Sequence, residues 1–278
     1  MTQGYSPQLA DKESALRLCL QQYGRLAIAF SGGVDSSLLL ALAAEELRED
    51  CLALTVAFCS APESEIEAAR DFCRTMGVRQ IIIEVDELEI PHFSENPPDR
   101  CYHCKTALFL MLQARAQAEG FELLADGTNA DDRGVYRPGL RAVDELKVLS
   151  PLAEQGLSKP EIRELSRQLK LDSADAPSRP CLATRFVYGE KLTRSGLARV
   201  REAEGFLEGC GLHSFRVRSH SGLARIEVTE EDWQRFSDKG FRSQVEAVFR
   251  GLGFDFVAID LSVFRSGSMD QALKGLDR

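Results

Sequence analysis

The sequence predicts an α/β protein, with a doubly wound parallel sheet followed by a smaller C-terminal α+β domain. The first observation is the alternation of short apolar runs with helical segments over residues 26–85, in the order β-α-β-α-β. The second is that these runs are almost continuously apolar, as in strands buried on both faces of a parallel sheet. The third is a change of pattern near residue 186. We therefore expect two domains, residues 1–185 and residues 186–278.

The elements of the first predicted domain follow in order. Helices are expected at residues 6–23, 37–47, 63–76, 105–118 and 158–171. Strands are expected at residues 26–30, 51–58, 80–85, 121–125 and 148–152. Ser158 is the predicted N-cap of the last helix, and Glu161 stands three residues later, as in a capping box. Residues 132–147 are expected to form a loop with a short helix.

The second predicted domain has a different order of elements. Helices are expected at residues 193–208 and 230–252, and strands at residues 215–219, 224–228 and 256–262. The first two strands alternate polar and apolar residues and meet at Ser221-Gly222, which predicts a hairpin.

Composition limits the classes of function. The chain has 278 residues, is 44% hydrophobic and carries a net charge of −9, which argues against nucleic acid as a partner. The N-terminus lacks the basic and apolar regions of a signal peptide, and the apolar runs are too short to span a bilayer. We expect a soluble, cytoplasmic protein with no membrane partner.

Residues 31–37, with the sequence SGGVDSS, separate the first predicted strand from the helix after it. Such a turn places backbone N–H groups and a helix N-terminus in front of an anion. The loop lacks the lysine of a Walker A motif. It resembles the PP-loop, S-G-G-x-D-S, of enzymes that cleave ATP to AMP and pyrophosphate. The alternative is an ordinary glycine-containing turn. On the PP-loop interpretation, Asp35 binds Mg²⁺, and the phosphate-binding residues are Ser31, Gly32, Gly33, Asp35, Ser36 and Ser37.

Two further segments follow predicted strands and therefore belong at the same edge of the sheet. Residues 55–60, beginning with Thr55, offer backbone groups to adenine. Residues 127–132 contain Gly127, Thr128, Asn129 and Asp131, whose small and polar side chains suit ribose and phosphate. The alternative for this segment is a turn followed by a helix cap.

Three of the eight cysteines have surroundings that suggest chemistry. Cys101 and Cys104 form a C-x-x-C motif, and Cys181 lies in a loop rich in Pro, Ser and Arg, between Arg179 and Arg185. Three thiolates suit a [4Fe–4S] cluster with one iron open to another ligand. The alternatives are a structural zinc site or inert thiols for the pair, and a buried loop residue for Cys181. Four other cysteines are predicted to be structural: Cys19, Cys51, Cys73 and Cys210.

The chain resembles the LarE family, the ATP-dependent sulfur transferases of nickel-pincer nucleotide cofactor synthesis. The resemblance rests on the 31–37 loop, the segment PCLATR at residues 180–185, and the motifs RVR at 216–218 and RIEV at 225–228. It covers most of the chain. It implies that a carboxylate of pyridinium-3,5-biscarboxylic acid mononucleotide is adenylated by ATP and Mg²⁺, and that a sulfur nucleophile then displaces AMP.

The resemblance also implies roles for the cysteines. In one form of the family a single cysteine at the position of Cys181 gives up its own sulfur. The addition of Cys101 and Cys104 resembles members with three cysteines, in which a [4Fe–4S] cluster carries sulfide from a sulfur donor. Arg185 is assigned to the same site. The family also implies a homo-oligomer assembled through the C-terminal domain.

Other polar residues of the C-terminal half are open to two interpretations. Arg216 and Arg218 share one face of a strand, and they either clamp the phosphate of the substrate or form salt bridges. Four glutamates are equally open: they either contact a metal or the substrate, or they are solvated surface charges. They are Glu190, Glu202, Glu204 and Glu227.

Three rival functions are open to test. A PP-loop tRNA thiolase also uses ATP and sulfur, but it needs a basic surface for RNA. An amidating enzyme needs a source of ammonia. A non-catalytic nucleotide- or iron–sulfur-binding module would not need the intact Asp35 and serines of the loop.

Overall fold

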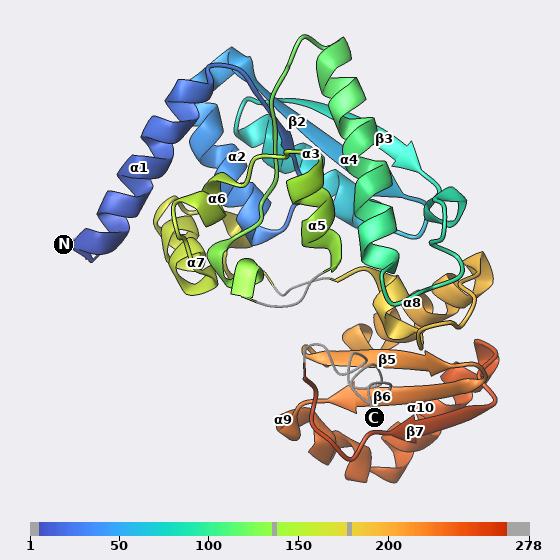
Figure 1. Ribbon diagram of the computed structural model, residues 1–278. Helices are drawn as coiled ribbons and strands as arrows, with labels where there is room; N and C mark the ends of the chain where they lie inside the picture. Colours follow the sequence, from blue (N-terminus) through green and yellow to red (C-terminus); the bar gives the residue numbers. More distant parts are fainter. Residues whose placement is uncertain (1–5, 135–137, 177–179, 266–278) are drawn as a thin grey trace. The chain divides into compact units, whose positions relative to one another are not determined.

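The computed structural model describes residues 6–134, 138–176 and 180–265. The chain divides into two compact units (Figure 1). Unit 1 comprises residues 1–87 and 101–179, and unit 2 comprises residues 88–100 and 180–278. Residues 88–100 therefore belong to unit 2 although unit 1 surrounds them in sequence. The predicted domain division after residue 185 stays a prediction, and each unit is described by itself.

Unit 1 is built on a parallel sheet with the order β3-β2-β1-β4. Its strands are β1 (Leu26–Ala29), β2 (Cys51–Phe58), β3 (Arg79–Val85) and β4 (Leu124–Ala125). The predicted α/β class is confirmed. The prediction of a strand at residues 148–152 was wrong, because among the described residues this range contains only an isolated β-bridge, between Ala125 and Leu149. Pro151, which has no N–H to donate to a ladder, begins a helix instead.

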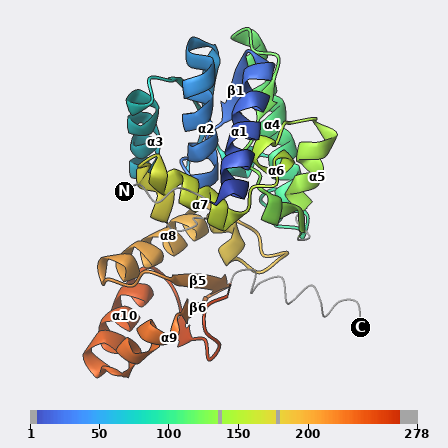
Figure 2. The same ribbon diagram turned by 90° about the vertical axis from the view of Figure 1, so that its left-hand side faces the viewer.

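Helices cover both faces of this sheet (Figures 1 and 2). They are α1 (Pro7–Tyr23), α2 (Val34–Leu47), α3 (Glu63–Thr75), α4 (Arg100–Ala118), α5 (Pro138–Glu145), α6 (Pro151–Glu154) and α7 (Lys159–Gln168). Ile28 of β1 belongs to a core formed with α1, α2, α3 and α7. Its neighbour Ala27 belongs to a second core formed with α4 and α5. Successive residues of one strand therefore point to opposite faces of the sheet, and both faces are covered, which is the doubly wound arrangement.

Short 3₁₀ segments complete unit 1. They are η1 (Arg48–Asp50), η3 (Ala130–Gly134) and η4 (Asp172–Asp175). A further segment, η2 (Glu87–Glu89), begins at the last residue of the first stretch of unit 1 and continues into residues assigned to unit 2.

Helix α4 begins five residues earlier than the sequence predicted. Helix was expected from residue 105, but it begins at Arg100, whose N–H donates to the Pro97 carbonyl at 3.0 Å. Proline is common at the positions where a helix begins, because its fixed φ is already near the helical value. The C-x-x-C motif consequently lies in the first turns of a helix rather than in a loop before it.

Unit 2 contains a three-stranded mixed sheet with the order β5-β6-β7. Its elements are η5 (Leu182–Arg185), α8 (Arg194–Gly209), β5 (Phe215–His220), β6 (Leu223–Val228), α9 (Glu230–Trp233), η6 (Gln234–Ser237), α10 (Lys239–Gly251) and β7 (Phe256–Ile259). β5 and β6 are antiparallel and meet at Ser221, whose φ of 55° lies in the left-handed region. β6 and β7 are parallel. The predicted smaller α+β region is confirmed.

The single helix predicted at residues 230–252 was wrong, because three segments occupy this range. Asp238 interrupts the helix with an extended backbone, and its carboxylate accepts the Phe241 N–H at 2.6 Å as the N-cap of α10. Over the described residues of both units, we find no helix that is both long and apolar enough to cross a membrane.

Candidate active site

The 31–37 loop leaves the carboxyl end of β1 and is closed by its own side chains. Ser36 Oγ donates to the Gly33 carbonyl at 3.1 Å, and it accepts the Ser31 N–H at 3.3 Å. Gly32 has a φ of 75°, in the left-handed region that glycine adopts without strain. The turn therefore has a fixed shape at the N-terminus of α2, where the helix dipole favours an anion.

Two features of this loop fit a phosphate ligand. Ser37 is buried, and its Oγ has no hydrogen-bond partner among the described residues. A buried hydroxyl left without a partner is costly unless a ligand or water satisfies it. Gly127 approaches the loop so closely that a Cβ placed on it would lie 2.9 Å from the Ser36 nitrogen. The two segments predicted to bind ATP are thus in contact.

A buried carboxylate, Asp126, organises the second segment. Its oxygens accept the Thr128 hydroxyl at 2.6 Å, the Thr128 N–H at 3.1 Å and the Ser150 hydroxyl at 2.8 Å. Asn129 Oδ1 accepts the N–H groups of Asp131 and Asp132 at 3.0 and 3.2 Å. These bonds fix the backbone after β4 with Gly127 held toward the 31–37 loop.

Asp35, the predicted Mg²⁺ ligand, lies in the first turn of α2 and is paired with a lysine. Lys159 Nζ lies 2.5 Å from Asp35 Oδ2, and Asn129 Nδ2 lies 3.4 Å from Asp35 Oδ1. The backbone N–H of Lys159 also donates to Asp131 at 2.8 Å. The start of α7 therefore joins both predicted nucleotide segments.

Thr55 lies within β2, where its buried hydroxyl accepts a hydrogen bond from Gln80 Nε2 at 2.9 Å. This bond holds the Thr55 side chain between β2 and β3. Its contribution to an adenine site stays a prediction.

Cys101 and Cys104 lie three residues apart on α4, which places both on one side of the helix. Cys101 is exposed and Cys104 is half-buried. Lys105 follows directly, and its Nζ lies 4.0 Å from Asp126 Oδ2. A Cβ on Gly139 would lie 2.9 Å from Lys105 Cδ and 3.4 Å from the Cys101 carbonyl oxygen, so α5 packs tightly against the start of α4.

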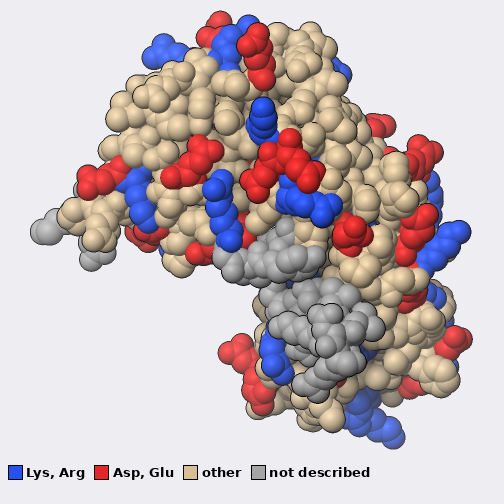
Figure 3. All heavy atoms as spheres, viewed as in Figure 1, with Lys and Arg blue, Asp and Glu red and all other residues tan. Residues whose placement is uncertain are grey.

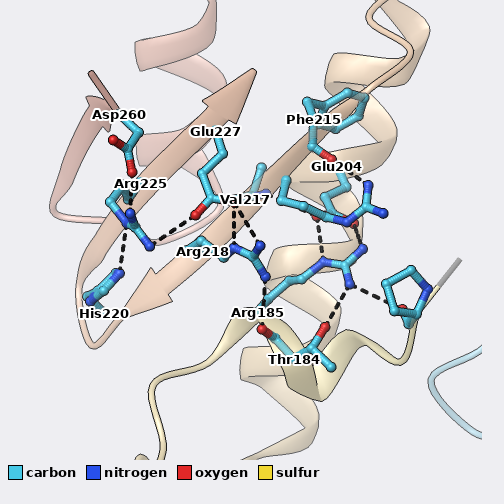
Figure 4. Close-up of polar contacts among 12 residues, drawn as sticks. Thr184, Arg185, Glu204, Phe215, Val217, Arg218, His220, Arg225, Glu227 and Asp260 are labelled. Atoms are coloured by element: carbon cyan, nitrogen blue, oxygen red, sulfur yellow. Dashed lines mark hydrogen bonds and ion pairs between the residues drawn. The ribbon is translucent and has the colours of Figure 1, made fainter. Parts of the chain in front are cut away.

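Cys181 lies in unit 2, exposed and immediately before η5. Arg185 is nearly fully buried, and it pairs with Glu204 through Nε to Oε1 at 2.8 Å and Nη2 to Oε2 at 2.9 Å (Figure 4). Its Nη1 donates to the Pro180 carbonyl at 3.1 Å. Arg185 therefore holds the backbone that carries Cys181. Arg179, on the other side of this cysteine, lies outside the described residues.

A second buried ion pair lies beside the first in unit 2. Arg218 contacts Glu227 through Nη2 at 2.7 Å, and its Nη1 donates to the Thr184 carbonyl at 3.0 Å (Figure 4). Arg216 donates to the Phe215 carbonyl at 2.6 Å. Burial, followed by the positive charge of Arg185, lowers the pKa of Arg216. The salt-bridge alternative is thus observed for Arg218, and phosphate binding by either arginine stays a prediction.

The predicted glutamates have mainly internal partners. Glu204 accepts the Val217 N–H at 3.0 Å in addition to its pair with Arg185, and Glu190 accepts the Ser221 N–H at 3.2 Å. Glu227 is buried and also pairs with Arg225 at 3.1 Å. Metal or substrate roles for these residues and for Glu202 stay predictions.

The buried cysteines differ from those of the predicted site. Burial raises the pKa of Cys51 to about 12 and that of Cys73 to about 12. Both belong to the core shared by α2 and α3, as predicted. Cys19 and Cys210 are half-buried.

Comparison with known proteins places the chain among relatives of similar length. Residues 13–132 match the family described as asparagine synthase. An uncharacterized protein of Synechocystis is 38% identical over 95% of this chain and 99% of its own length. An uncharacterized protein of Methanocaldococcus jannaschii is 31% identical over 87% of this chain and 91% of its own. The pyridinium-3,5-bisthiocarboxylic acid mononucleotide synthase of Lactiplantibacillus plantarum is 33% identical over 95% of this chain and 96% of its own.

The chain belongs to the LarE-like PP-loop ATP pyrophosphatases. Membership of this family implies that the LarE-like chain binds ATP. The close contact of Gly127 with the loop and the unpartnered Ser37 hydroxyl fit phosphates there.

The predicted site residues of the LarE-like chain fall in both units. Unit 1 brings together the 31–37 loop, residues 127–131 and, through Lys105, the helix that carries Cys101 and Cys104. Unit 2 carries Cys181, Arg185, Arg216 and Arg218.

Sequence reasoning missed three residues of unit 1 that join the predicted segments: Lys105, Asp126 and Lys159. Asp126 had a usable signal, because it is the first polar residue after an apolar run that ends in a predicted strand. Lys159 had the weaker signal of standing directly after the predicted N-cap, Ser158. Lys105 had no sequence signal beyond its position next to Cys104.

Proposed function

We propose that this LarE-like protein is an ATP-dependent sulfur transferase acting on pyridinium-3,5-biscarboxylic acid mononucleotide. It adenylates a carboxylate of this substrate and replaces a carboxylate oxygen with sulfur, which gives a thiocarboxylate. The similarity to a synthase of the corresponding bisthiocarboxylic acid mononucleotide supports the choice of substrate. The structural observation that carries the proposal is the contact of Lys105, next to Cys104, with Asp126, which organises the predicted nucleotide segment.

The first step activates the carboxylate. An oxygen of the substrate attacks the α-phosphorus of ATP, the bond from that phosphorus to the β-phosphate oxygen breaks, and pyrophosphate leaves. The backbone N–H groups of the 31–37 loop and the α2 N-terminus stabilise negative charge on the departing phosphates. Lys159 supplies a positive charge beside Asp35. Mg²⁺ held by Asp35 would neutralise further phosphate charge.

The second step transfers sulfur. A sulfur nucleophile attacks the acyl carbon, and AMP leaves with the electron pair of the carbon–oxygen bond. A [4Fe–4S] cluster held by Cys101, Cys104 and Cys181 would supply this sulfur at an iron that no protein ligand occupies. The exposure of Cys101 and Cys181 and the partial exposure of Cys104 suit such a donor set, in contrast with the core thiols. Arg185 fixes the backbone next to Cys181, and Arg216 and Arg218 bind the phosphate of the substrate.

Release of pyrophosphate tests the first step. The purified chain is mixed under anaerobic conditions with ATP, Mg²⁺ and the mononucleotide, and pyrophosphate, AMP and thiocarboxylate are measured. We expect pyrophosphate release that depends on the mononucleotide, and we expect it to persist in C181S, where adenylation can occur without sulfur transfer. Release that occurs equally with and without the mononucleotide contradicts the proposal.

Iron content and intact mass identify the sulfur source. Anaerobic reconstitution is expected to give about four irons per chain and repeated turnover, and both should be lost in C101S, C104S and C181S. C210S is the matched control, because Cys210 lies in unit 2 at the end of α8. A chain without iron whose Cys181 loses one sulfur atom per product would contradict the cluster and support donation by Cys181.

A tRNA thiolase is the rival outcome of the same assays. Pyrophosphate release that depends on RNA instead of the mononucleotide would support it. Basic side chains lie among acidic ones on the described part of the face in Figure 3, and this mixed distribution does not favour RNA. Cytoplasmic location and assembly into a homo-oligomer also stay predictions, the second testable by light scattering.

A further inference from the structure

The carboxyl ends of β2 and β3 bring together three side chains with no role in the proposed function. Cys59 directly follows β2, and Asp86 and Glu87 directly follow β3. The two strands are parallel, with Phe58 opposite Val85, and the Cys59 N–H donates to the Val85 carbonyl at 3.1 Å. The strand register therefore fixes the three residues at one edge of the sheet.

The potential ligand atoms of this group are close to one another. The Cys59 Sγ and a carboxylate oxygen from each of Asp86 and Glu87 all lie within 4.8 Å of one another. Cys59 is exposed and Asp86 is half-buried, so the group is open to solvent on one side. Glu87 is 3% exposed and is the most buried residue of the group.

Glu87 is the observation that points to a ligand. Neither of its carboxylate oxygens has a hydrogen-bond partner among the described residues. Burying an ionised carboxylate without a partner is costly, so such groups are protonated, paired or bound to a metal. A thiol and another carboxylate each have a potential ligand atom within 4.8 Å of this carboxylate, and a cation would draw the three together.

We propose that Cys59, Asp86 and Glu87 form a binding site for a divalent transition-metal ion, with Zn²⁺ as the best fit. Mg²⁺ and Ca²⁺ take oxygen ligands, whereas zinc accepts thiolate sulfur and carboxylate oxygen together. Ligand atoms of a tetrahedral zinc site are separated by roughly 3.4–3.8 Å. The potential ligand atoms here lie within 4.8 Å of one another, so their separations exceed the zinc values by about 1 Å at most. Rotation of the accessible Cys59 and Asp86 side chains can close this difference.

Three protein ligands leave one position of a tetrahedral ion open to water or a small anion. In the strand order β3-β2-β1-β4, this site lies at the same edge as the 31–37 loop but on the opposite side of β2 from β1. Its side chains are not those assigned to ATP or sulfur transfer. Metal binding and the proposed activity can therefore be tested separately.

Zinc binding is measured in the full chain carrying C101S, C104S and C181S, which removes the competing thiols. Zn²⁺ is titrated against a chromophoric chelator, and Co²⁺ is used as a second probe because a cobalt–thiolate bond absorbs in the near ultraviolet. We expect about one Zn²⁺ per chain and a cobalt–thiolate band. Adding C59S, D86N or E87Q should each weaken zinc binding by at least about tenfold, and C59S should also remove the band.

C210S in the same background is the control, because Cys210 lies in unit 2 and should leave zinc binding unchanged. Absence of zinc uptake in this background overturns the proposal, as does uptake that survives both C59S and E87Q. If E87Q does not fold, C59S decides the matter, because the exposed thiol can be replaced without loss of core packing. Zinc should also raise the unfolding temperature of the parent chain but not that of C59S.

Discussion

The Nζ atom of Lys159 lies 2.5 Å from Oδ2 of Asp35, and this contact joins the N-terminal turns of two helices at the predicted nucleotide site. Asp35 lies in the first turn of α2, and Lys159 is the first residue of α7. The capping box of Ser158 and Glu161 fixes the backbone at that lysine. The Lys159 ammonium group is thus held beside the 31–37 loop, where the phosphates of ATP are predicted to bind.

K159M is expected to lower kcat for pyrophosphate release by about 10²–10³-fold, because one preorganised positive charge is removed from the leaving phosphates. K159R should retain part of the activity. K147M is the control, because Lys147 is exposed on unit 1 and lies outside the predicted nucleotide segments. A K159M protein with wild-type kinetics would show that the lysine only balances the charge of Asp35.

G127A tests the close approach of the two segments that are predicted to bind the nucleotide. A Cβ at this position would lie 2.9 Å from the Ser36 nitrogen and 3.2 Å from its Cα. Because both atoms belong to the backbone, one segment must move, which should reduce the free energy of unfolding by about 1–3 kcal/mol. Binding of a non-hydrolysable ATP analogue should weaken by roughly tenfold or more.

The control for this substitution is G205A. Gly205 lies within α8, where an added Cβ meets nothing within 4 Å. Alanine there should stabilise the chain by up to about 1 kcal/mol through helix propensity. Equal effects of the two substitutions in urea unfolding would refute the steric explanation for G127A.

The parts of the site that local patterns encode could be predicted from the sequence. The turn between β1 and α2 and the capping box of α7 each depend on residues within a few positions. The pair of Lys159 and Asp35 could not be predicted in this way, because 124 positions separate its members and the fold alone brings them together.

The errors in the elements have similar physical causes. Helix α4 begins at Arg100 because the Pro97 carbonyl accepts the first bond, and the polar composition of this stretch concealed that start. The apolar periodicity of residues 230–252 continues through Asp238, but the capping bond of its carboxylate begins a new helix there. In both cases one hydrogen bond decided the boundary, and periodicity does not encode it.

E204Q tests whether the buried pair with Arg185 supports unit 2. The amide keeps an acceptor for the Val217 N–H but removes the charge opposite a guanidinium that is 4% exposed. We expect a loss of about 3–5 kcal/mol in the free energy of unfolding, because the remaining charge is buried without its partner. E246Q, in an exposed pair with Arg250, should change stability by less than about 0.5 kcal/mol. Similar losses in urea denaturation would contradict the distinction.

Thiol labelling should separate the core cysteines from the accessible ones. With iodoacetamide at pH 8, mass spectrometry is expected to find Cys59 modified and Cys51 and Cys73 unmodified, because burial raises the pKa of both core thiols to about 12. These thiols should also make stability fall with rising pH above about 8.5, since the unfolded chain releases their protons first. Labelling of Cys51 in the folded chain at a rate close to that of Cys59 would contradict this assignment.

His220 should make unit 2 less stable as the pH falls. Arg225 Nε donates to His220 Nε2 at 3.1 Å, a bond that requires this ring nitrogen to be unprotonated. Burial, followed by the positive charge of Arg225, lowers the pKa of His220 in the folded state, although Glu227 and Asp260 oppose the shift. The unfolded chain therefore binds this proton first on acidification, so the stability present above about pH 6.5 is lost as the pH falls through the depressed pKa.

H220Q should remove this component, because glutamine can offer an acceptor to Arg225 but does not titrate. The free energy of unfolding, measured in urea between pH 7 and pH 5, should fall more steeply for the parent chain than for H220Q, by less than about 1.4 kcal/mol per pH unit. H213Q, at an exposed histidine of the same unit, should follow the parent. If H220Q follows the parent slope instead, His220 does not account for the acid sensitivity of unit 2.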